Sequence, residues 1–397
     1  TAADSAGQFE ILKGEPSGNL SATATDMARF ALAHLALGKA GETRILREET
    51  ARLMGTTAFR THPGVPGMAL GFFEEDRHGR RIIGHGGDLS RFHSHLSLLM
   101  DEGVGFFISV NSSGSGASQY GVREAVMDAF LERYFPRQIP LEPVAAGASE
   151  ISKRWVGAYT LSRRGESTMA RVIALLIDLT LEANPDGSLQ IRFLTGPSGR
   201  PIKWYPIDST LYRNEDGTQL IGFVPASGEL PTRMAFVGGH ELHQTPASDG
   251  RGFNLFVLIG SLVVFAGTLL LWPVAALTRR RFRARAITDG VSRGVRIATR
   301  LGALAGIAFA VAIGTFIMLA LDDSIHRDSR SDWVLGLIRV IGLLAVVGMI
   351  PSIVALLQSF RGNSGWARLK YLLLVLAGVG FSWFIIHWNL LSTNFRY

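Results

Sequence analysis

The chain has 397 residues, of which 47% are hydrophobic and 18% are charged, whereas a soluble domain typically carries about 25% charged residues. The absence of cysteine excludes disulfides, thiolate metal sites and a cysteine nucleophile. The net charge of +7 does not point to nucleic acid, because eight arginines at 279–300 stand between two apolar stretches, where basic residues set membrane topology. Long stretches after residue 253 carry no charge, so the sequence predicts a soluble half followed by a lipid-embedded half.

The first predicted element is a helix over residues 24–37. Turn-forming residues at 16–20 precede it, and Thr23 and Asp26 have the spacing of a capping box. Apolar residues then recur at helical spacing as far as Leu35, and Gly38 is expected to end the helix. A second short helix is predicted at 47–54.

From residue 68 the apolar period changes to that of strands. Strands are predicted at 69–75, 81–84, 93–100 and 104–111, with turns at His78-Gly79 and at 101–103. An amphipathic helix is predicted at 119–134. Strands followed by a covering helix indicate an α+β fold with an antiparallel sheet for residues 1–135.

Residues 136–150 contain three prolines and no periodicity, which predicts a linker. Residues 151–250 follow as a small β-rich domain, because short strand-like runs at 188–194, 210–213, 219–224 and 233–237 alternate with turn signals. A helix is expected within this domain at about 169–177.

Four transmembrane helices are predicted at 253–277, 301–321, 333–357 and 371–391, because about 20 apolar residues suffice to cross the hydrocarbon core. Arg339 and His387 are the clearest polar groups within these spans. So few ionisable groups indicate an anchor rather than a transport path.

The loops between the spans predict the orientation of the protein. The first holds the eight arginines, the second, at 322–332, is acidic on balance, and the third, at 359–370, holds three basic residues. Because basic loops stay in the cytoplasm, we expect residues 1–252 and Tyr397 to lie outside a bacterial plasma membrane. The chain begins at Thr1 without a signal peptide, so we expect the export signal to lie upstream.

The stretch most suggestive of chemistry is GHGGDLSRFHSH at 84–95. His93 and His95 would share one strand face as a possible ligand pair, but zinc needs three or four ligands and spacing places no third, so no metal and no cofactor is predicted. Gly86 and Gly87 beside His85 would let a ligand approach the backbone, with N–H groups facing a developing oxyanion. The alternative is a glycine-lined bulge.

Residues 16–30, PSGNLSATATDMARF, resemble the P-A-G-G-L-x-S-T-A-x-D-x-A-R-F segment of the serine β-lactamase superfamily, which includes class C β-lactamases, D-alanyl-D-alanine carboxypeptidases and related esterases. The HGG at 85–87 resembles the His-x-Gly form of the third active-site motif of that family, and 84–111 its motif strand with the hairpin that follows. The resemblance covers 1 to about 135 and implies a partial β-lactamase- or transpeptidase-like fold. The β-rich domain and membrane tail resemble the C-terminal extension that a subgroup of this superfamily carries.

The resemblance also implies roles for individual residues. His85 takes the place of the motif lysine, polarising the site and positioning the acyl or carboxyl group of the substrate. The backbone N–H of Asp88 matches the second oxyanion donor, and Gly87 the residue that keeps the strand open. Arg91 stands where the family often has glycine. Its long cationic side chain would narrow the entrance of the active site or change the charge there.

The chain lacks the nucleophile motif of the family, Ser-x-x-Lys, because none of its five lysines follows a serine by three residues. The letters of the second motif occur only by chance, at Tyr212-Arg213-Asn214 and at 17–19, in the wrong place in the order. Both missing motifs precede the matching segment in the family. We therefore expect this chain to be the C-terminal part of a longer protein and to be inactive alone.

The sequence is consistent with two functions. The first is a membrane-anchored serine hydrolase that acts through an acyl-enzyme on an amide or ester, such as a β-lactam, a cell-wall peptide or a small ester. Its partners would be that substrate and the lipid bilayer, with no nucleic acid. The alternative is a non-catalytic binding or sensory module on a four-helix anchor, and a transporter is disfavoured by the apolar spans. An upstream Ser-x-x-Lys would favour the hydrolase.

Overall fold

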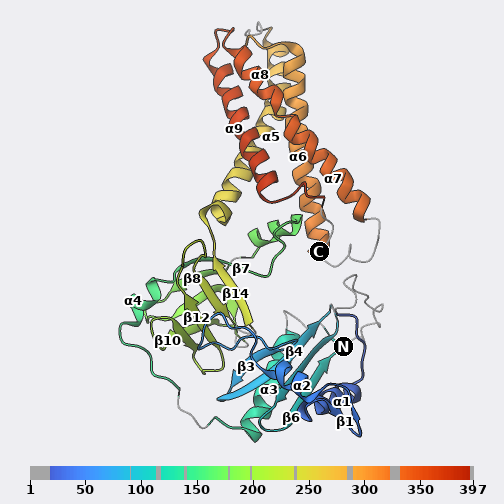
Figure 1. Ribbon diagram of the computed structural model, residues 1–397. Coiled ribbons are helices and arrows are strands. Elements are labelled where there is room, and N and C mark those ends of the chain that lie inside the picture. Colours follow the sequence, from blue (N-terminus) through green and yellow to red (C-terminus); the bar gives the residue numbers. More distant parts are fainter. Residues whose placement is uncertain are drawn as a thin grey trace. The chain divides into compact units, whose positions relative to one another are not determined.

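The structure is a computed structural model, which describes residues 18–89, 91–112, 118–137, 141–177, 179–196, 199–236, 239–283, 289–321 and 331–393. The start of the resemblance segment at 16–17, Ser90 and the acidic loop at 322–330 lie outside the described residues. The chain forms two compact units (Figure 1). The first is made of residues 1–163 and 178–245, and the second of residues 164–177 and 246–397.

The first unit begins with α1 (Ala24–Leu35), and its predicted capping box is confirmed. The Thr23 hydroxyl accepts from the Asp26 backbone N–H at 3.2 Å, and the Asp26 carboxylate accepts from the Thr23 backbone N–H at 3.2 Å. The helix ends before Gly38, whose φ of +88° is left-handed. A short hairpin, β1 (Lys39–Ala40) and β2 (Thr43–Arg44), leads to α2 (Glu48–Gly55).

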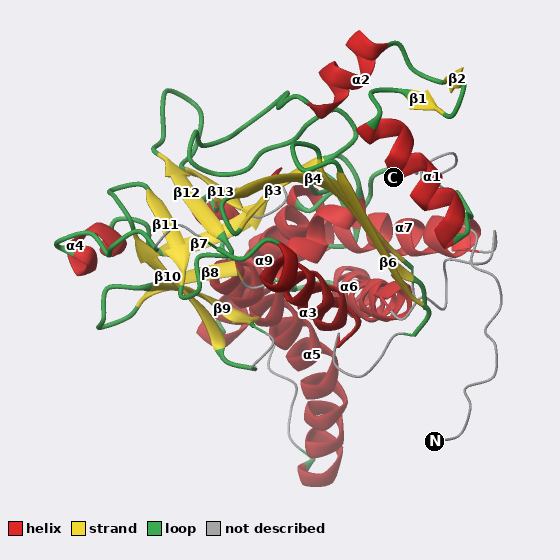
Figure 2. Ribbon diagram, turned by 90° about the horizontal axis from the view of Figure 1, so that it is seen from below, coloured by secondary structure: helices red, strands yellow, loops and turns green. Residues whose placement is uncertain are grey.

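In the described residues, the first sheet is antiparallel with the strand order β3-β4-β5-β6. Its strands are β3 (Phe73–Arg77), β4 (Arg80–Asp88), β5 (His93–Leu99) and β6 (Val104–Val110). Alternate residues of each strand face opposite sides, so Ile83 packs with α1 while Ile82 packs with α3 (Ser118–Tyr134). Figure 2 shows these two helices on either side of the sheet, and the α+β prediction is confirmed.

Two strand boundaries differ from the prediction. The first strand starts at Phe73 instead of residue 69, because Gly71, with φ of +83°, makes a turn in which the Ala69 N–H donates to the Phe72 carbonyl at 2.9 Å. The second continues to Asp88 instead of stopping at Gly84, because β5 pairs with it as far as His93. Pairing with a neighbour overrides the low strand propensity of glycine.

The β-rich part, as far as the structure describes it, is a closed antiparallel barrel with the order β10-β11-β12-β13-β14-β7-β8-β9. Closure removes exposed strand edges. The short helix α4 (Ala148–Lys153) precedes it. The interior of the barrel is aromatic. The ring of Trp155 stacks on that of Phe223 with centroids 4.6 Å apart, and Trp204 and Tyr212 are fully buried. The strands are β7 (Gly157–Leu161), β8 (Leu179–Ala183), β9 (Leu189–Thr195), β10 (Pro201–Pro206), β11 (Leu211–Asn214), β12 (Leu220–Val224), β13 (Arg233–Phe236) and β14 (His240–Gln244).

The second unit holds, among the described residues, four stretches of helix long and apolar enough to cross a membrane. They are α5 (Arg251–Phe282), α6 (Arg293–Leu321), α7 (Ser331–Val347) continued by α8 (Ile350–Ser359), and α9 (Gly365–His387). The third predicted span is thus two helices. Pro351 lies in the first turn of α8, where its missing N–H costs no hydrogen bond, and Gly348 packs against Gly302 of α6.

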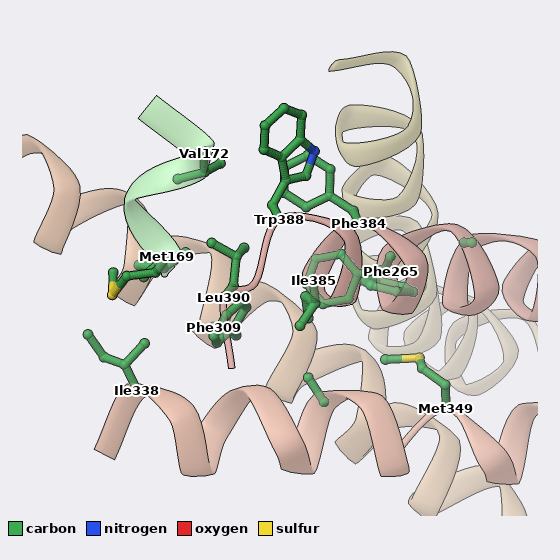
Figure 3. Packing of buried hydrophobic residues seen from close by; sticks show 14 of the residues in the cluster. Met169, Val172, Phe265, Phe309, Ile338, Met349, Phe384, Ile385, Trp388 and Leu390 are labelled. Atoms are coloured by element: carbon green, nitrogen blue, oxygen red, sulfur yellow. The ribbon is translucent and has the colours of Figure 1, made fainter. Parts of the chain in front are cut away.

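The predicted helix at 169–177 is a 3₁₀ helix, η1 (Met169–Leu175), and it belongs to the second unit. Figure 3 shows its Met169 and Val172 among the buried side chains of the helices, with Phe309 and Trp388. A polar contact accompanies them: the buried Asp249 carboxylate, just before α5, accepts from His387 at 2.8 Å and from Arg171 at 3.1 Å. His387 is therefore paired.

Candidate active site

The candidate site is built on the end of β4 that extends beyond its neighbour. Pairing between β3 and β4 ends at Phe73 and Gly84, whereas pairing between β4 and β5 continues to Asp88 and His93. Within the described residues, 85–88 are thus paired on the β5 side only, and their other backbone edge is open. The register along β5 is continuous, so the alternative of a glycine bulge is wrong for this strand.

His85 lies at the start of this open edge. Its Nδ1 donates to the Gly86 carbonyl at 2.6 Å, and its ring stacks on Phe73 with centroids 4.8 Å apart. A carbonyl oxygen only accepts, so the contact requires the proton on Nδ1. The neutral ring then offers Nε2 as an acceptor, and the protonated ring offers a second donor.

A pocket of about 460 Å³ adjoins the ring of His85. The chain folds so that the open strand edge forms one side and barrel residues another. The Phe73 ring lies between His85 and the barrel residue His240, whose centroid is 5.8 Å away. Burial and the nearby Arg163 charge both lower the pKa of His240. The lining residues are Phe59, Met68, Phe73, His85, Ser162, Arg163, Gly239, His240 and Glu241.

Glycines 84 and 87 of β4 have different surroundings. A Cβ on Gly84 would lie 2.1 Å from the Leu96 carbonyl oxygen, so packing alone requires glycine there. A Cβ on Gly87 would meet nothing within 4 Å. No packing contact therefore demands glycine at 87, and the space beside it allows a ligand to approach the backbone closely.

The Asp88 side chain is paired with two cationic or donor groups. Its Oδ1 accepts from His93 Nδ1 at 2.8 Å and lies 2.9 Å from Nη2 of Arg123, a buried residue of α3. The same arginine donates to the Ser94 carbonyl at 2.7 Å. These contacts fix the end of β4 and so orient its backbone N–H groups. Arg91 is exposed in the β4–β5 connection and is not one of the pocket-lining residues.

The two strand histidines contact different carboxylates. His93 pairs with Asp88, whereas His95 Nε2 lies 3.3 Å from the Glu75 carboxylate. Burial opposes ionisation of Glu75, but His95 and Arg77 together lower its pKa to about 2. Among the described residues no group of three His, Asp or Glu side chains is placed to hold a metal ion.

The loop at 57–70 contributes Phe59 and Met68 to the pocket lining, and it is hydrogen-bonded to both the sheet and the barrel. Burial alone would raise the pKa of Glu74, but hydrogen bonds from Thr57, Arg81, the Gly67 N–H and Arg60 lower it to about 2. On the barrel side, the Thr61 hydroxyl donates to Glu241 at 2.6 Å. The lining is thus held in place before any ligand arrives.

Sequence reasoning singled out His85, which lines the pocket, but it missed the residues on the barrel side. Ser162, Arg163, His240 and Glu241 lie about 75 or more positions from His85 in the chain and carry no motif. The fold alone brings them to the open edge of β4. A local pattern could not have identified them.

Comparison with known proteins identifies a family for the first part of the chain. Among solved structures, the chain is similar to SurE with D-Leu (19% identity, TM-score 0.35, 56% of this chain and 50% of that one), to SurE (18%, 0.34, 56% and 48%) and to the octameric penicillin-binding protein homologue from Pyrococcus abyssi (15%, 0.24, 55% and 46%). The chain thus spans about half the length of these proteins. No curated protein matches it. The model of the Beta-lactamase family matches residues 1–129, and this segment belongs to that family.

Proposed function

We propose that this chain is the C-terminal part of a membrane-anchored, extracytoplasmic serine hydrolase that acts on an amide or ester through an acyl-enzyme. The observation that carries the proposal is the open edge of β4 at 85–88, which borders a pocket and lies in a β-lactamase-family segment. The nucleophilic serine and its lysine would come from a segment upstream of Thr1, since the 397 residues hold no Ser-x-x-Lys.

The reaction assigns distinct tasks to the groups at this edge. The serine oxygen would attack the substrate carbonyl carbon, and the carbonyl oxygen would take up the negative charge. Backbone N–H groups of the open edge, that of Asp88 among them, would donate to this oxyanion. The leaving amine or alcohol would depart with the proton that the serine hydroxyl gave up, and water would then add to the acyl carbon and release the acid and the free serine.

His85 would act as an electrostatic and positioning group. The proton on Nδ1 is engaged by the Gly86 carbonyl, so Nε2 is the atom that can meet a substrate carboxyl or acyl group. Stacking on Phe73 holds the ring plane in one orientation. A fixed donor or acceptor stabilises developing charge without reorganising during the reaction.

The test compares the purified chain 1–397 with a longer product of the same gene that carries the upstream segment. We expect a serine-reactive fluorophosphonate to label only the longer protein, and only that protein to hydrolyse nitrocefin or a short nitrophenyl ester. Labelling and turnover by chain 1–397, abolished by the same probe, would contradict the proposal. So would an upstream segment with no serine that the probe labels.

A binding or sensory module remains the second candidate, because this chain forms a preorganised pocket although it holds no Ser-x-x-Lys. In that case, the longer protein would bind a cell-wall peptide with unchanged affinity after substitution of every upstream serine. A hydrolase would lose turnover on substitution of one serine. Calorimetry and turnover measured on the same variants separate the two functions.

A further inference from the structure

One end of the membrane unit concentrates positive charge. Within the described residues of 279–300 and 361–370, Asp289 is the single carboxylate against ten cations. The basic side chains come from the end of α5, the start of α6, the start of α9 and the connection that precedes α9. They are Arg279, Arg280, Arg281, Arg283, Arg293, Arg296, Arg300, Arg361, Arg368 and Lys370.

Two of these cations, Arg300 and Lys370, are half-buried and make no salt bridge in the part of the chain that the structure describes, although the Asp289 carboxylate is close enough to attract both. The Arg300 guanidinium lies over the Trp272 ring at 4.3 Å, and Lys370 Nζ lies 4.1 Å from the Tyr371 ring. Neither makes a hydrogen bond or ion pair with any described residue. A ring face attracts a cation but accepts only a small part of its hydrogen-bonding capacity.

The single nearby carboxylate is already occupied. Asp289 lies 3.6 Å from Arg296 and accepts from the Tyr371 hydroxyl at 3.3 Å. The cluster of Arg296, Arg300 and Lys370 around Asp289 therefore has a net charge of about +2. Partly desolvated charge without a partner is unfavourable, and an added anion would relieve it.

The cluster is held in place by the chain around it. Gly290, with φ of +75°, packs so closely on the α8–α9 connection that a Cβ would lie 2.6 Å from the Gly362 nitrogen. The Ser292 N–H donates to Gln358 Oε1 at 2.9 Å. The three helix ends thus present their cations in a fixed arrangement, which lowers the conformational entropy that the site loses when a ligand binds.

We propose that Arg300 and Lys370 bind the phosphate of an anionic phospholipid headgroup. A lipid fits better than free phosphate because large apolar side chains next to the cluster on α5 and α6, among them Leu271, Val274 and Ile297, are exposed and can contact acyl chains. Trp272, which is 49% exposed, sits where interfacial aromatic residues face headgroups. A headgroup without a compensating ammonium suits the unbalanced positive charge.

The test uses the full chain in mixed micelles, with bound lipid counted by native mass spectrometry. Phosphatidylglycerol should be retained in preference to phosphatidylcholine by roughly 25-fold, since each cation near a headgroup contributes on the order of a fivefold preference. The double variant Arg300→Gln with Lys370→Gln should lose most of that preference, whereas Lys370→Arg should keep it.

The matched control is Arg280→Gln with Arg281→Gln, which removes the same charge from exposed positions and should leave the retained lipid unchanged. Equal loss in both double variants would overturn the site in favour of diffuse attraction. Efficient displacement of the lipid by glycerol phosphate would also contradict it, because acyl contacts would then contribute nothing. If the double variant does not fold, the lipid preference of the wild type and of the single variants still tests the proposal. A wild type that does not distinguish between charged and neutral headgroups would refute it.

Discussion

Replacing the buried Glu74 by Gln should destabilise the soluble unit in a strongly pH-dependent way. The carboxylate has only 1% of its side-chain surface exposed and lies 3.0 Å from Arg60, with Arg81 as a second cation. A fall in pKa from 4.5 to about 2 corresponds to roughly 3 kcal/mol, at about 1.36 kcal/mol per pKa unit. Both arginines are more than one-third exposed, and solvent screening reduces this to about 2 kcal/mol.

The sign follows from the lowered pKa. The stabilisation from Glu74 is fully present above the unfolded pKa near 4.5 and is lost as the pH falls toward about 2. Chemical denaturation of the full chain in micelles, followed by tryptophan fluorescence, should give a difference in unfolding free energy between wild type and Glu74→Gln of about 2 kcal/mol at pH 7. That difference should fall by more than half at pH 3. A difference that stays constant between these pH values would refute the reasoning, as would one below about 0.5 kcal/mol at pH 7.

Three further changes test the site and the topology. In the longer gene product, His85→Ala should lower kcat/KM by roughly 10²–10³ while the thermal midpoint hardly moves; a large stability loss with unchanged activity per folded molecule would make His85 structural. Gly84→Ala should destabilise the protein by about 2 kcal/mol or more because its Cβ meets backbone, whereas Gly87→Ala should leave denaturation unchanged and lower kcat/KM. A cytoplasm-dependent reporter fused after Arg285 should be active, and one fused after Ser329 should need export; the reverse pattern would place the β4 edge in the cytoplasm.

The membrane half was predictable because lipid imposes one simple condition on sequence. Four stretches that lack charge, or nearly so, correspond to four apolar stretches of helix in the described residues. The break in the third stretch at 348–349 was missed, although Pro351 signals a new helix start. Hydropathy measures composition along a span and does not register where its backbone hydrogen bonds are interrupted.

The soluble half was predictable where the signals were local. The capping residues predicted the start of α1, and the glycine at 79 predicted the hairpin turn, where its φ is positive in the structure. Strands β7, β8, β10 and β14 were missed. The alternation in β8, Leu-Thr-Leu-Glu-Ala, is a strand signal that could have been used, whereas the polar sequence of β14, His-Glu-Leu-His-Gln, gives none. The same limit applies to the pocket, whose barrel side depends on contacts between segments far apart in the chain.

The path of the chain between its two compact units has a consequence for proteolytic release. The polypeptide passes from one unit to the other three times, at 163–164, 177–178 and 245–246. A protease that cut only the segment before α5 would leave the soluble unit attached through the loop that carries η1. A single cut before α5 therefore breaks the covalent link without freeing residues 1–245, which stay attached until η1 leaves its packing against the helices. The η1 segment thus gives residues 1–245 a second, noncovalent attachment to the helical unit.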